Sequence, residues 1–474
     1  MDTIAAKGMR FVDAQGRERI FHGLNYGKIK ELDLDENFFE QCNTLGFNVL
    51  RLCINWEFIE PAQGRYDEEY LRRIDAILAL AAQYHVHVFL DMHQDMYSAF
   101  GIGEGDGAPL WACVPDGAER GHAKKVWAEG YFFSKAVHNC FNHFWANDPV
   151  SGKGLQAHYA ALWQMLARRY GDSPALLGFD VMNEPFPNQG GKIFRKMVGS
   201  LVSACLTSPK VHRLRLLKNL LQKQPLDQAA LDVVDPWLLR KATGAADDEL
   251  RKFDHLDYTL FLARMQKALR EVTPNGLFMF EHSYYHNLGQ PFHAQVPAGE
   301  TKAVYSPHAY DFTVDTPAYA YASNERVHTI FAAARDYQQR AGVPVLVGEW
   351  GGGGPNEDYH FHIAFLLDLF DQWGWSNAYY AYTPGAFNDP IMQVLSRPYP
   401  TAVNGLIESL RVNTKEQTLT LRYTPAATDL PTEIYLPNGF LRVETADGTA
   451  PALTQEGHIL KVKTTSAIIK VFYV

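Results

Sequence analysis

The chain has 474 residues, of which 47% are hydrophobic and 20% are charged, enough apolar material for one large globular domain and a smaller one. Its formal net charge of -9 argues against nucleic acid as a partner, because a phosphate backbone is bound by a basic surface. The sequence contains no run of about 18 apolar residues that could cross a bilayer.

Short β-branched or aromatic runs alternate with longer helical patterns along most of the chain, as expected for βα units around a parallel sheet. Eight such runs occur, at residues 19–25, 48–55, 86–93, 176–183, 277–282, 303–308, 343–349 and 377–382. Eight parallel strands with helices between them predict a (β/α)8 TIM barrel.

The segments between and after these strands complete the predicted organisation. Apolar residues recur at helical spacing in 70–81 and 159–170, whereas 94–149 and 185–250 are long inserts of the kind that shape binding sites. From residue 410, short alternating runs broken by P-N-G and A-D-G-T turns predict a small all-β sandwich. We therefore expect a catalytic barrel domain over residues 1–395 and a C-terminal β-sandwich domain over residues 396–474.

The cysteines and the first residues bear on the compartment. The five cysteines are Cys42, Cys53, Cys113, Cys140 and Cys205. They are odd in number and form no C-x-x-C pair, which indicates a reducing compartment and no structural zinc. Residues 1–8 contain no apolar stretch of signal-peptide length, so we expect a cytoplasmic protein, with a trimmed secreted form as the alternative. A monomer is the default expectation for the oligomeric state.

Polar residues at the ends of the predicted strands indicate where the chemistry lies, because TIM-barrel sites form at the carboxyl ends of the strands. The stretch V-M-N-E-P-F places Asn183 and Glu184 directly after an apolar run, where a charge is costly unless it lies at the barrel mouth. The other strand ends carry Arg51, His93, Asp95, His308, Tyr310 and Glu349. Glu184 and Glu349 are therefore expected to face each other across the mouth.

A pair of carboxyl groups flanking a bond is what glycoside hydrolysis requires, one to protonate the departing oxygen and one to attack or to activate water. Two other interpretations compete with this one. A hard-cation site would need further acidic oxygens, which Asp95 and Glu281 could supply. Alternatively, Glu184 could merely solvate the start of a loop. The many aromatic residues suit stacking on sugar rings, although aromatic residues also form cores.

The motifs at the strand ends together resemble glycoside hydrolase family 5. They are N-E-P after strand four, G-E-W after strand seven, Arg51 in strand two, His93 after strand three and H-x-Y after strand six, and they cover the barrel. Four further features are similar to the endoglycoceramidase and glucosylceramidase branch: G-L-N-Y-G-K, D-M-H-Q-D, the long insert after it, and R-P-Y-P before the sandwich.

The resemblance implies a role for each matching residue. Glu184 would be the general acid/base and Glu349 the nucleophile, with Tyr310 holding Glu349. The substrate-binding and supporting positions would be Asn183 at the sugar 2-hydroxyl, Arg51 beneath the nucleophile, His93 and Asp95 at other hydroxyls, His308 near the acid/base and Lys28 at the first sugar. Many relatives present a tryptophan after strand eight, where this chain reads A-Y-Y-A-Y-T-P-G, so Tyr382 is expected to stack in its place. Its smaller ring leaves glucose, galactose and a longer glycan open.

These inferences predict a retaining β-glycosidase that releases a sugar or short glycan from a ceramide or similar lipid. Its carboxyl groups should lie about 5 to 5.5 Å apart, with the pKa of Glu184 raised and Glu349 ionised beside Arg51. We expect no metal, no other cofactor and no nucleic-acid partner. An endo-β-glucanase or other soluble β-glucoside hydrolase is one alternative, and a binding protein on an inactive barrel is the other. Exo or endo action, and a ceramide or sterol aglycone, stay open.

The insert after strand four is basic and amphipathic. No acidic residue occurs between Glu184 and Asp227, where eight lysines and arginines lie: Lys192, Arg195, Lys196, Lys210, Arg213, Arg215, Lys218 and Lys223. Phe194, Met197, Val198, Leu201 and Val202 repeat at helical spacing. One hypothesis is that residues 190–223 contact a lipid surface with this apolar stripe. The alternative is that the stripe packs on the barrel and the charges are solvated.

Overall fold

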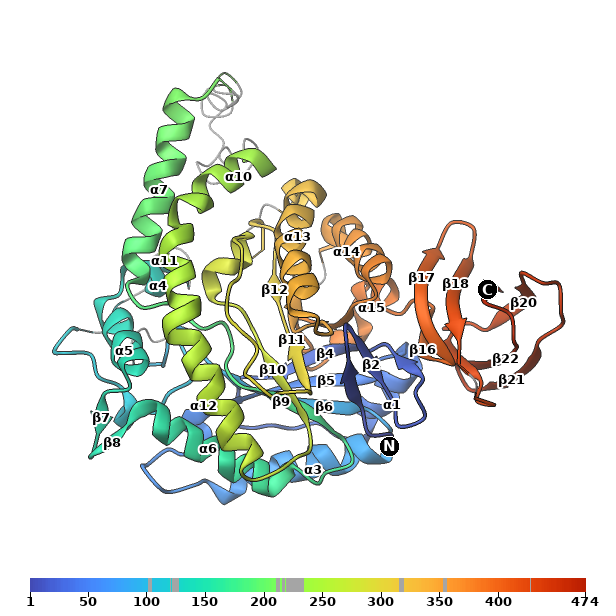
Figure 1. The fold of residues 1–474 in the computed structure, drawn as a ribbon, viewed down its shortest axis with the longest axis horizontal. Coiled ribbons are helices and arrows are strands. Elements are labelled where there is room, and N and C mark those ends of the chain that lie inside the picture. Colours follow the sequence, from blue (N-terminus) through green and yellow to red (C-terminus); the bar gives the residue numbers. More distant parts are fainter. Residues whose placement is uncertain are drawn as a thin grey trace.

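The computed structural model describes residues 1–100, 105–119, 121, 128–209, 214, 218, 234–314, 319–352, 356–426 and 428–474. Two structural units are visible in Figure 1, a barrel of strands surrounded by helices and a smaller all-β unit that contains the C-terminus. This arrangement confirms the predicted fold class, a TIM barrel followed by a β-sandwich.

Eight parallel strands form the barrel, in the order β11-β10-β9-β6-β5-β4-β15-β13. They are β4 (His22–Gly27), β5 (Val49–Asn55), β6 (His87–His93), β9 (Leu176–Asp180), β10 (Leu277–Phe280), β11 (Ala303–Tyr305), β13 (Leu346–Val347) and β15 (Ser376–Tyr379). A parallel bridge between Tyr305 and Val345 closes the ring. All eight lie within the predicted segments, apart from two residues at the end of β4 and one residue, Ser376, at the start of β15. Every residue of β5 and β6 is buried, as expected for strands covered on both faces.

A second parallel pair extends the barrel at the mouth. Strand β12 (His308–Ala309) pairs with β14 (Glu349–Trp350), and His308 is in register with Glu349. Because these strands continue from β11 and β13, they bring residues predicted for the site directly together.

Helices cover the outside of the barrel (Figure 1). The main ones are α1 (Glu36–Leu45), α3 (Glu68–Gln83), α6 (Leu155–Tyr170), α12 (Thr259–Arg270), α13 (Asn324–Ala341) and α14 (His360–Trp373). Helix α3 begins where the Asp67 side chain accepts hydrogen bonds from two backbone N–H groups of the first turn, which have no partner within the helix. The predicted apolar faces of α3 and α6 are buried against the barrel.

The two long connections form additional layers on the barrel. The connection between β6 and α6 contains η1 (Leu110–Ala112), α4 (Glu129–Phe133), α5 (Lys135–Ala146), β7 (Pro149–Val150) and β8 (Lys153–Gly154). The connection between β9 and α12 contains α7 (Gly190–Thr207), α10 (Pro236–Thr243), η2 (Gly244–Ala246), α11 (Asp247–Lys252) and η3 (Phe253–Tyr258). The shorter elements are α2 (Trp56–Ile59), η4 (Tyr284–Leu288), η5 (Tyr319–Tyr321), η6 (Glu357–Tyr359), η7 (Ala386–Asn388) and α15 (Ile391–Leu395). In the part of the chain that is described, no helix is both long enough and apolar enough to span a membrane.

The sandwich consists of a seven-stranded and a four-stranded antiparallel sheet. The first contains β1 (Ala5–Lys7), β2 (Arg10–Val12), β3 (Glu18–Arg19), β16 (Tyr399–Val403), β19 (Thr432–Tyr435), β22 (Ile459–Lys463) and β21 (Ala452–Glu456). The second contains β17 (Gly405–Asn413), β18 (Thr418–Pro425), β23 (Ile468–Tyr473) and β20 (Phe440–Thr445). Their facing side chains form a separate buried cluster, which includes Val403, Leu421 and Val471.

The sandwich is tied to both the barrel and the start of the chain. The Tyr399 hydroxyl donates to the carbonyl of Gly46 at 2.7 Å, and the Tyr399 ring stacks on His22. Strand β3 pairs with β16, so the first 19 residues contribute strands to the sheet of the sandwich. The division into domains at residues 395 and 396 stays a prediction, and these three strands cross it.

Candidate active site

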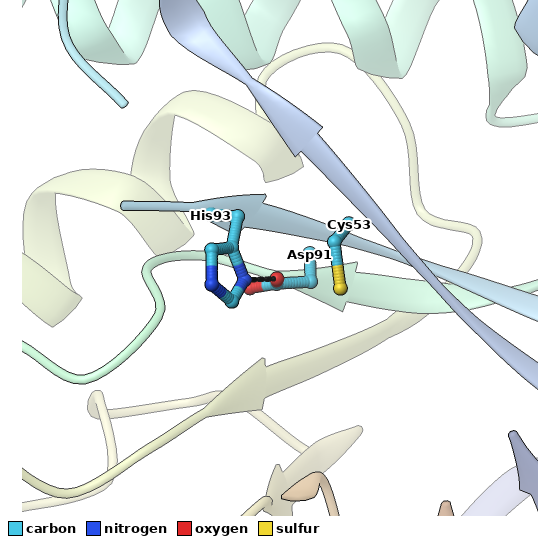
Figure 2. A group of neighbouring side chains, drawn as sticks. All are labelled: Cys53, Asp91 and His93. Carbon is cyan, nitrogen blue, oxygen red and sulfur yellow. Dashed lines mark hydrogen bonds and ion pairs between the residues drawn. The ribbon is translucent and has the colours of Figure 1, made fainter. Parts of the chain in front are cut away.

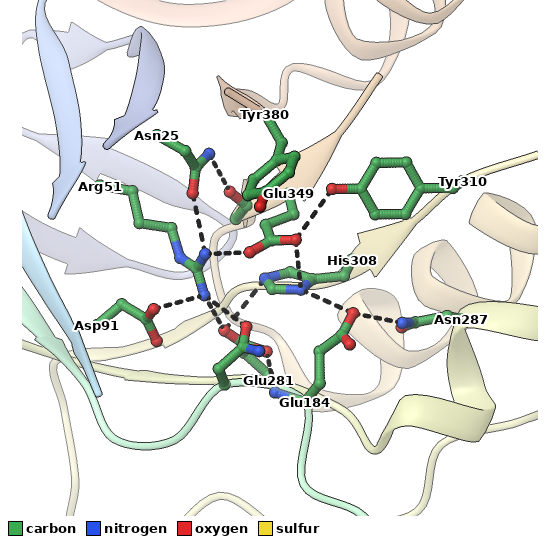
Figure 3. A network of polar contacts seen from close by, with 12 residues as sticks. Asn25, Arg51, Asp91, Glu184, Glu281, Asn287, His308, Tyr310, Glu349 and Tyr380 are labelled. Carbon is green, nitrogen blue, oxygen red and sulfur yellow. Dashed lines mark hydrogen bonds and ion pairs between the residues drawn. The ribbon is translucent and has the colours of Figure 1, made fainter. Parts of the chain in front are cut away.

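Arg51 on β5 lies at the centre of a buried polar network at the barrel mouth (Figure 3). Its Nη1 donates to Glu349 Oε1 at 2.5 Å and to Asn25 Oδ1 at 2.9 Å. Its Nη2 donates to Asn183 Oδ1 at 2.9 Å and to Glu281 Oε1 at 2.7 Å. The rigid fork of a guanidinium suits such a role, because it holds several acceptors in fixed relative positions. The structure therefore brings Arg51, Asn183 and Glu349 together, as the strand-end pattern predicted.

Glu349 is held as an ionised carboxylate. Besides Arg51, the Tyr310 hydroxyl donates to its Oε2 at 2.9 Å. Burial opposes ionisation, but the positive charges of His308, Arg51 and two further cations lower the pKa of Glu349 to about 2. An ionised carboxylate held by donors on both oxygens fits the properties required of a nucleophile.

Glu184 follows β9, and its pKa is shifted in the opposite direction to that of Glu349. Burial raises its pKa, and the charge of Glu349 adds to this effect, although His308 acts against it. Its backbone lies in the left-handed region, at φ 38°, which is uncommon for a residue other than glycine. The backbone N–H of Glu184 donates to Glu281 Oε2 at 2.7 Å, and this bond holds the turn in place. Its Oε1 accepts from Asn287 Nδ2 at 2.5 Å and lies 3.2 Å from His308 Nδ1.

His308 connects the two glutamates. Its Nδ1 lies 3.8 Å from Glu349 Oε2, and its Nε2 lies 3.1 Å from Glu281 Oε1. Burial would lower the pKa of His308, but the charges of Glu281 and Glu349 raise it to about 10. One oxygen of Glu184, one oxygen of Glu349 and one ring nitrogen of His308 all lie within 4.8 Å of one another. The two carboxyl groups are thus close enough to act on a single bond.

A second polar group lies beside Glu349. Lys28 forms an ion pair with Asp95, and its Nζ lies 3.4 Å from the Tyr380 hydroxyl. His93 Nε2 lies 3.6 Å from Asp95 Oδ2. The positive charges of Lys28 and His93 hold the pKa of Asp95 well below its usual range, even though burial opposes this. These alternating donors and acceptors can bind the hydroxyl groups of a sugar.

The residue of strand eight that reaches the site is Tyr380, whereas the sequence pattern pointed to Tyr382. Tyr380 lies next to Lys28 and is close enough to Glu349 for that charge to raise its pKa. Tyr382 instead packs in an aromatic cluster, with ring centroids 4.8 Å from Phe38 and 4.7 Å from Phe387. Strand β15 ends at Tyr379, so both tyrosines lie in the segment that follows the strand.

Four network residues were not predicted from the sequence: Asn25, Asp91, Asn287 and Tyr380. Asp91 had a detectable signal, because it lies two residues before His93 on one strand and therefore on the same face. Its Oδ2 contacts both Arg51 Nη2, at 3.1 Å, and His93 Nδ1, at 2.7 Å. Glu281, considered as a metal ligand, is fully buried and bonded to Arg51 and the Glu184 backbone.

Several clusters have the composition of metal sites. They include Cys53, Asp91 and His93 (Figure 2), and Glu184, His308 and Glu349. Burial raises the pKa of the Cys53 thiol, whereas a metal binds the thiolate. His308 carries a proton at neutral pH, and Arg51 already binds Asp91 and Glu349. These carboxylates are thus paired with cations of the protein itself, an arrangement that fits a hydrogen-bonded network better than a metal centre.

Comparison with known families identifies the barrel. The family model described as Cellulase (glycosyl hydrolase family 5) matches residues 12–208 and 257–385. The chain belongs to glycosyl hydrolase family 5. A second model, Glycoside hydrolase family 5 C-terminal domain, matches residues 397–470, which contain most of the sandwich. The family 5 resemblance inferred from the strand-end motifs is confirmed.

Similar proteins are found within this family. An endoglycoceramidase from Cyanea nozakii is 30% identical over 229 residues, which cover 41% of this chain and 43% of that protein. Endoglycoceramidase I from Rhodococcus hoagii is 24% identical over 463 residues, which cover 92% of this chain and 80% of that one. The solved ganglioside GM3 complex of endo-glycoceramidase II from Rhodococcus sp. aligns with a TM-score of 0.75 and 23% identity, over 99% of this chain and 100% of the other.

Proposed function

We propose that this family 5 chain is a retaining β-glycosidase that cleaves a sugar or short glycan from a ceramide or similar lipid. Glu349 attacks the anomeric carbon while Glu184 donates its proton to the departing oxygen, and the bond between that carbon and oxygen breaks. Glu184 then takes a proton from water, which displaces Glu349 from the sugar. Two inversions leave the β configuration retained.

The spacing of the two glutamates carries this mechanism. Carboxyl groups lie about 5 to 5.5 Å apart in retaining enzymes and about 6.5 to 9.5 Å apart in inverting ones, which need room for water. An oxygen of Glu184 and an oxygen of Glu349 lie within 4.8 Å, which fits the shorter class. The opposite pKa shifts support the same roles, because the acid must hold a proton while the nucleophile is ionised.

An aromatic cluster beside Glu184 supports a lipid aglycone. Tyr131 is close enough to Asp95 and Glu184 for their charges, together with burial, to raise its pKa, and its ring lies 4.4 Å from that of Tyr284. Next to them, Phe132 stacks on Phe194 at 4.4 Å, and the rings of Phe133 and Phe194 lie 5.5 Å apart. Because the acid protonates the aglycone oxygen, the aglycone must leave past this side of the site.

The cluster also reaches the surface, since the Phe133 side chain is 70% exposed. Aromatic rings in contact with one another run from the side of the acid/base to this exposed residue. Such an apolar surface suits a hydrocarbon chain better than a further sugar, which would need polar partners. The relatives named endoglycoceramidase, and the ganglioside complex of the similar Rhodococcus structure, support the same substrate class.

A substrate panel tests this proposal. The wild-type protein is expected to release sugar or glycan from at least one of glucosylceramide, galactosylceramide and lactosylceramide, with the β product seen first by NMR. Steryl glucoside and a chromogenic β-glucoside complete the panel. Release from carboxymethyl cellulose with no action on glycolipids would replace the proposal by an endo-β-glucanase, and binding without turnover on every substrate would replace it by a binding protein.

The outer face of α7 extends the apolar surface, and we propose that it contacts the lipid surface that holds the substrate. Val198, Val202 and Leu206 lie one helical turn apart and are 39%, 51% and 69% exposed. Met197 is buried, so one part of the predicted apolar stripe packs against the protein and the other part is exposed to solvent. In Figure 1, α7 projects beyond the barrel.

The basic residues of this insert have unequal roles. Lys192 and Lys196 pair with Glu249 on α11, while Arg195 and Lys218 are exposed. Lys210, Arg213, Arg215 and Lys223 lie outside the described residues. The proposal therefore rests on the apolar face and not on the full set of charges.

Replacement of Val202 and Leu206 by serine is expected to lower activity on vesicle-embedded glycolipid several-fold and to spare a soluble aryl glycoside. Removing exposed apolar area weakens insertion into a lipid interface and leaves the distant glutamates intact. The matched control replaces Leu260 and Leu441, which are 65% and 66% exposed elsewhere, and should change neither activity. An equal fall on both substrates, or the same fall in the control, would show that α7 has no lipid contact.

A further inference from the structure

Asn287 on η4 contacts the side chain of Glu184, although it belongs to none of the motifs that identify the family (Figure 3). Its Nδ2 donates to Glu184 Oε1 at 2.5 Å, and His308 Nδ1 lies 3.2 Å from the same oxygen. Among the residues that the structure describes, none donates to Glu184 Oε2. The two oxygens of this carboxyl group are therefore in unequal environments.

His282 determines which way the Asn287 amide points. Its Nε2 lies 2.8 Å from Asn287 Oδ1 and 2.9 Å from the His308 carbonyl, while its Nδ1 lies 2.6 Å from the Tyr305 hydroxyl. Burial holds the pKa of His282 well below its usual range, so the neutral ring carries one N–H. Two acceptors lie close to Nε2, whereas the one donor that faces it, the His308 N–H, is farther away at 3.3 Å. The hydrogen therefore lies on Nε2.

A definite direction of hydrogen bonding follows. Tyr305 donates to His282 Nδ1, His282 Nε2 donates to Asn287 Oδ1, and the Asn287 amide presents its N–H to Glu184. An amide nitrogen only donates, so the proton of Glu184 is best placed on the other oxygen, Oε2. When that proton has been transferred, the same N–H stabilises the carboxylate that remains.

We propose that Asn287, oriented by His282, is a positioning residue that occupies Oε1 of Glu184 and leaves the catalytic proton on Oε2. This inference rests on the proposed function, in which Glu184 protonates the aglycone oxygen. The proton moves from Oε2 to that oxygen as the glycosidic bond breaks, and its electron pair goes to the departing group. Asn287 touches neither substrate nor water in this step and acts only through Glu184.

Substrates with good and poor leaving groups test the inference. Asn287→Ala is expected to lower kcat/KM on an alkyl β-glycoside by about 10- to 100-fold, within the range of acid catalysis, and to spare the 2,4-dinitrophenyl glycoside, whose departure needs no acid. Loss of a donor to the carboxylate also raises the pKa of Glu184, so the fall of kcat/KM at alkaline pH should move to higher pH. Asn287→Asp should move it in the same direction and further, because it adds a like charge.

Asn275→Ala is the matched control, since Asn275 donates to Asp172 at the surface and the same amide is lost far from the site. This variant should leave kcat/KM on both glycosides and the pH profile unchanged. If Asn287→Ala does not fold, the isosteric Asn287→Asp variant gives the same comparison. Equal losses on both glycosides, or an unmoved alkaline limb, would overturn the inference. Wild-type protein inactive on every glycoside would instead overturn the proposed function, so the two failures can be told apart.

Discussion

Glu349→Gln is expected to lower turnover of every β-glycoside by roughly 10⁴-fold or more, because the covalent route is lost with the nucleophile. The protein should still fold. Arg51, which loses one partner, keeps its contacts with Asp91 and Glu281, so no cation is left unpaired in the core. Tyr310→Phe is the matched control, since it removes only the hydroxyl that donates to Oε2 and should cost far less activity.

Trapping of the covalent intermediate checks the assignment directly. A 2-deoxy-2-fluoro β-glycoside with a good leaving group should inactivate the wild-type protein with a mass increase of one sugar. Peptide mapping should place the adduct on Glu349, and Glu349→Gln should not be labelled. An adduct on another carboxyl group, or a product first released in the α configuration, would remove this mechanism.

Glu184→Ala is expected to lower kcat/KM on glycolipids by about 10² to 10⁴-fold and to leave the 2,4-dinitrophenyl glycoside much less affected at that step. Azide should restore turnover of the activated substrate and give a β-glycosyl azide, because a small anion can enter the space left by the carboxyl group. Equal loss on every substrate without azide rescue would assign the acid/base role elsewhere.

The pH profile gives a second readout of Glu184. The acid must be protonated, so kcat/KM on a poor leaving group should fall as pH rises through the raised pKa of Glu184. Glu349 has a pKa of about 2, so it stays ionised over the whole working range and should not limit activity on the acid side. Glu184→Ala should abolish the alkaline fall, and its persistence in that variant would assign it to another group.

The barrel could be predicted because its strands are encoded locally. Each is a short apolar run between turn residues, and the polar residues that follow them, such as Arg51, Glu184 and Glu349, must meet where parallel strands end. Other contacts come from the fold and not from a sequence pattern. The pairing of β12 with β14 places His308 beside Glu349, although no pattern links the two residues in sequence.

The residues that escaped prediction depend on structure beyond regular strands. Tyr380 comes after the end of β15, and the stretch A-Y-Y-A-Y offers several tyrosines for the position at which relatives present a tryptophan, so the resemblance alone does not distinguish Tyr380 from Tyr382. Asn287 lies on η4, and its contact with Glu184 depends on the neighbouring His282. The pairing of β3 with β16 joins distant parts of the chain and leaves no periodic signal in either segment.

The pairing of β3 with β16 can form only late in synthesis of the chain. Arg10 on β2 donates to the carbonyl of Ile407 on β17, across 397 positions of sequence. At about 5 to 20 residues per second of synthesis, the N-terminal strands wait roughly 20 to 80 seconds for this partner. During that interval β3 can pair with β2, but the edge that will pair with β16 has no strand beside it and is open to other chains. A chain that ends before residue 399 lacks β16, so this edge of β3 stays uncovered, whereas the completed sandwich covers it.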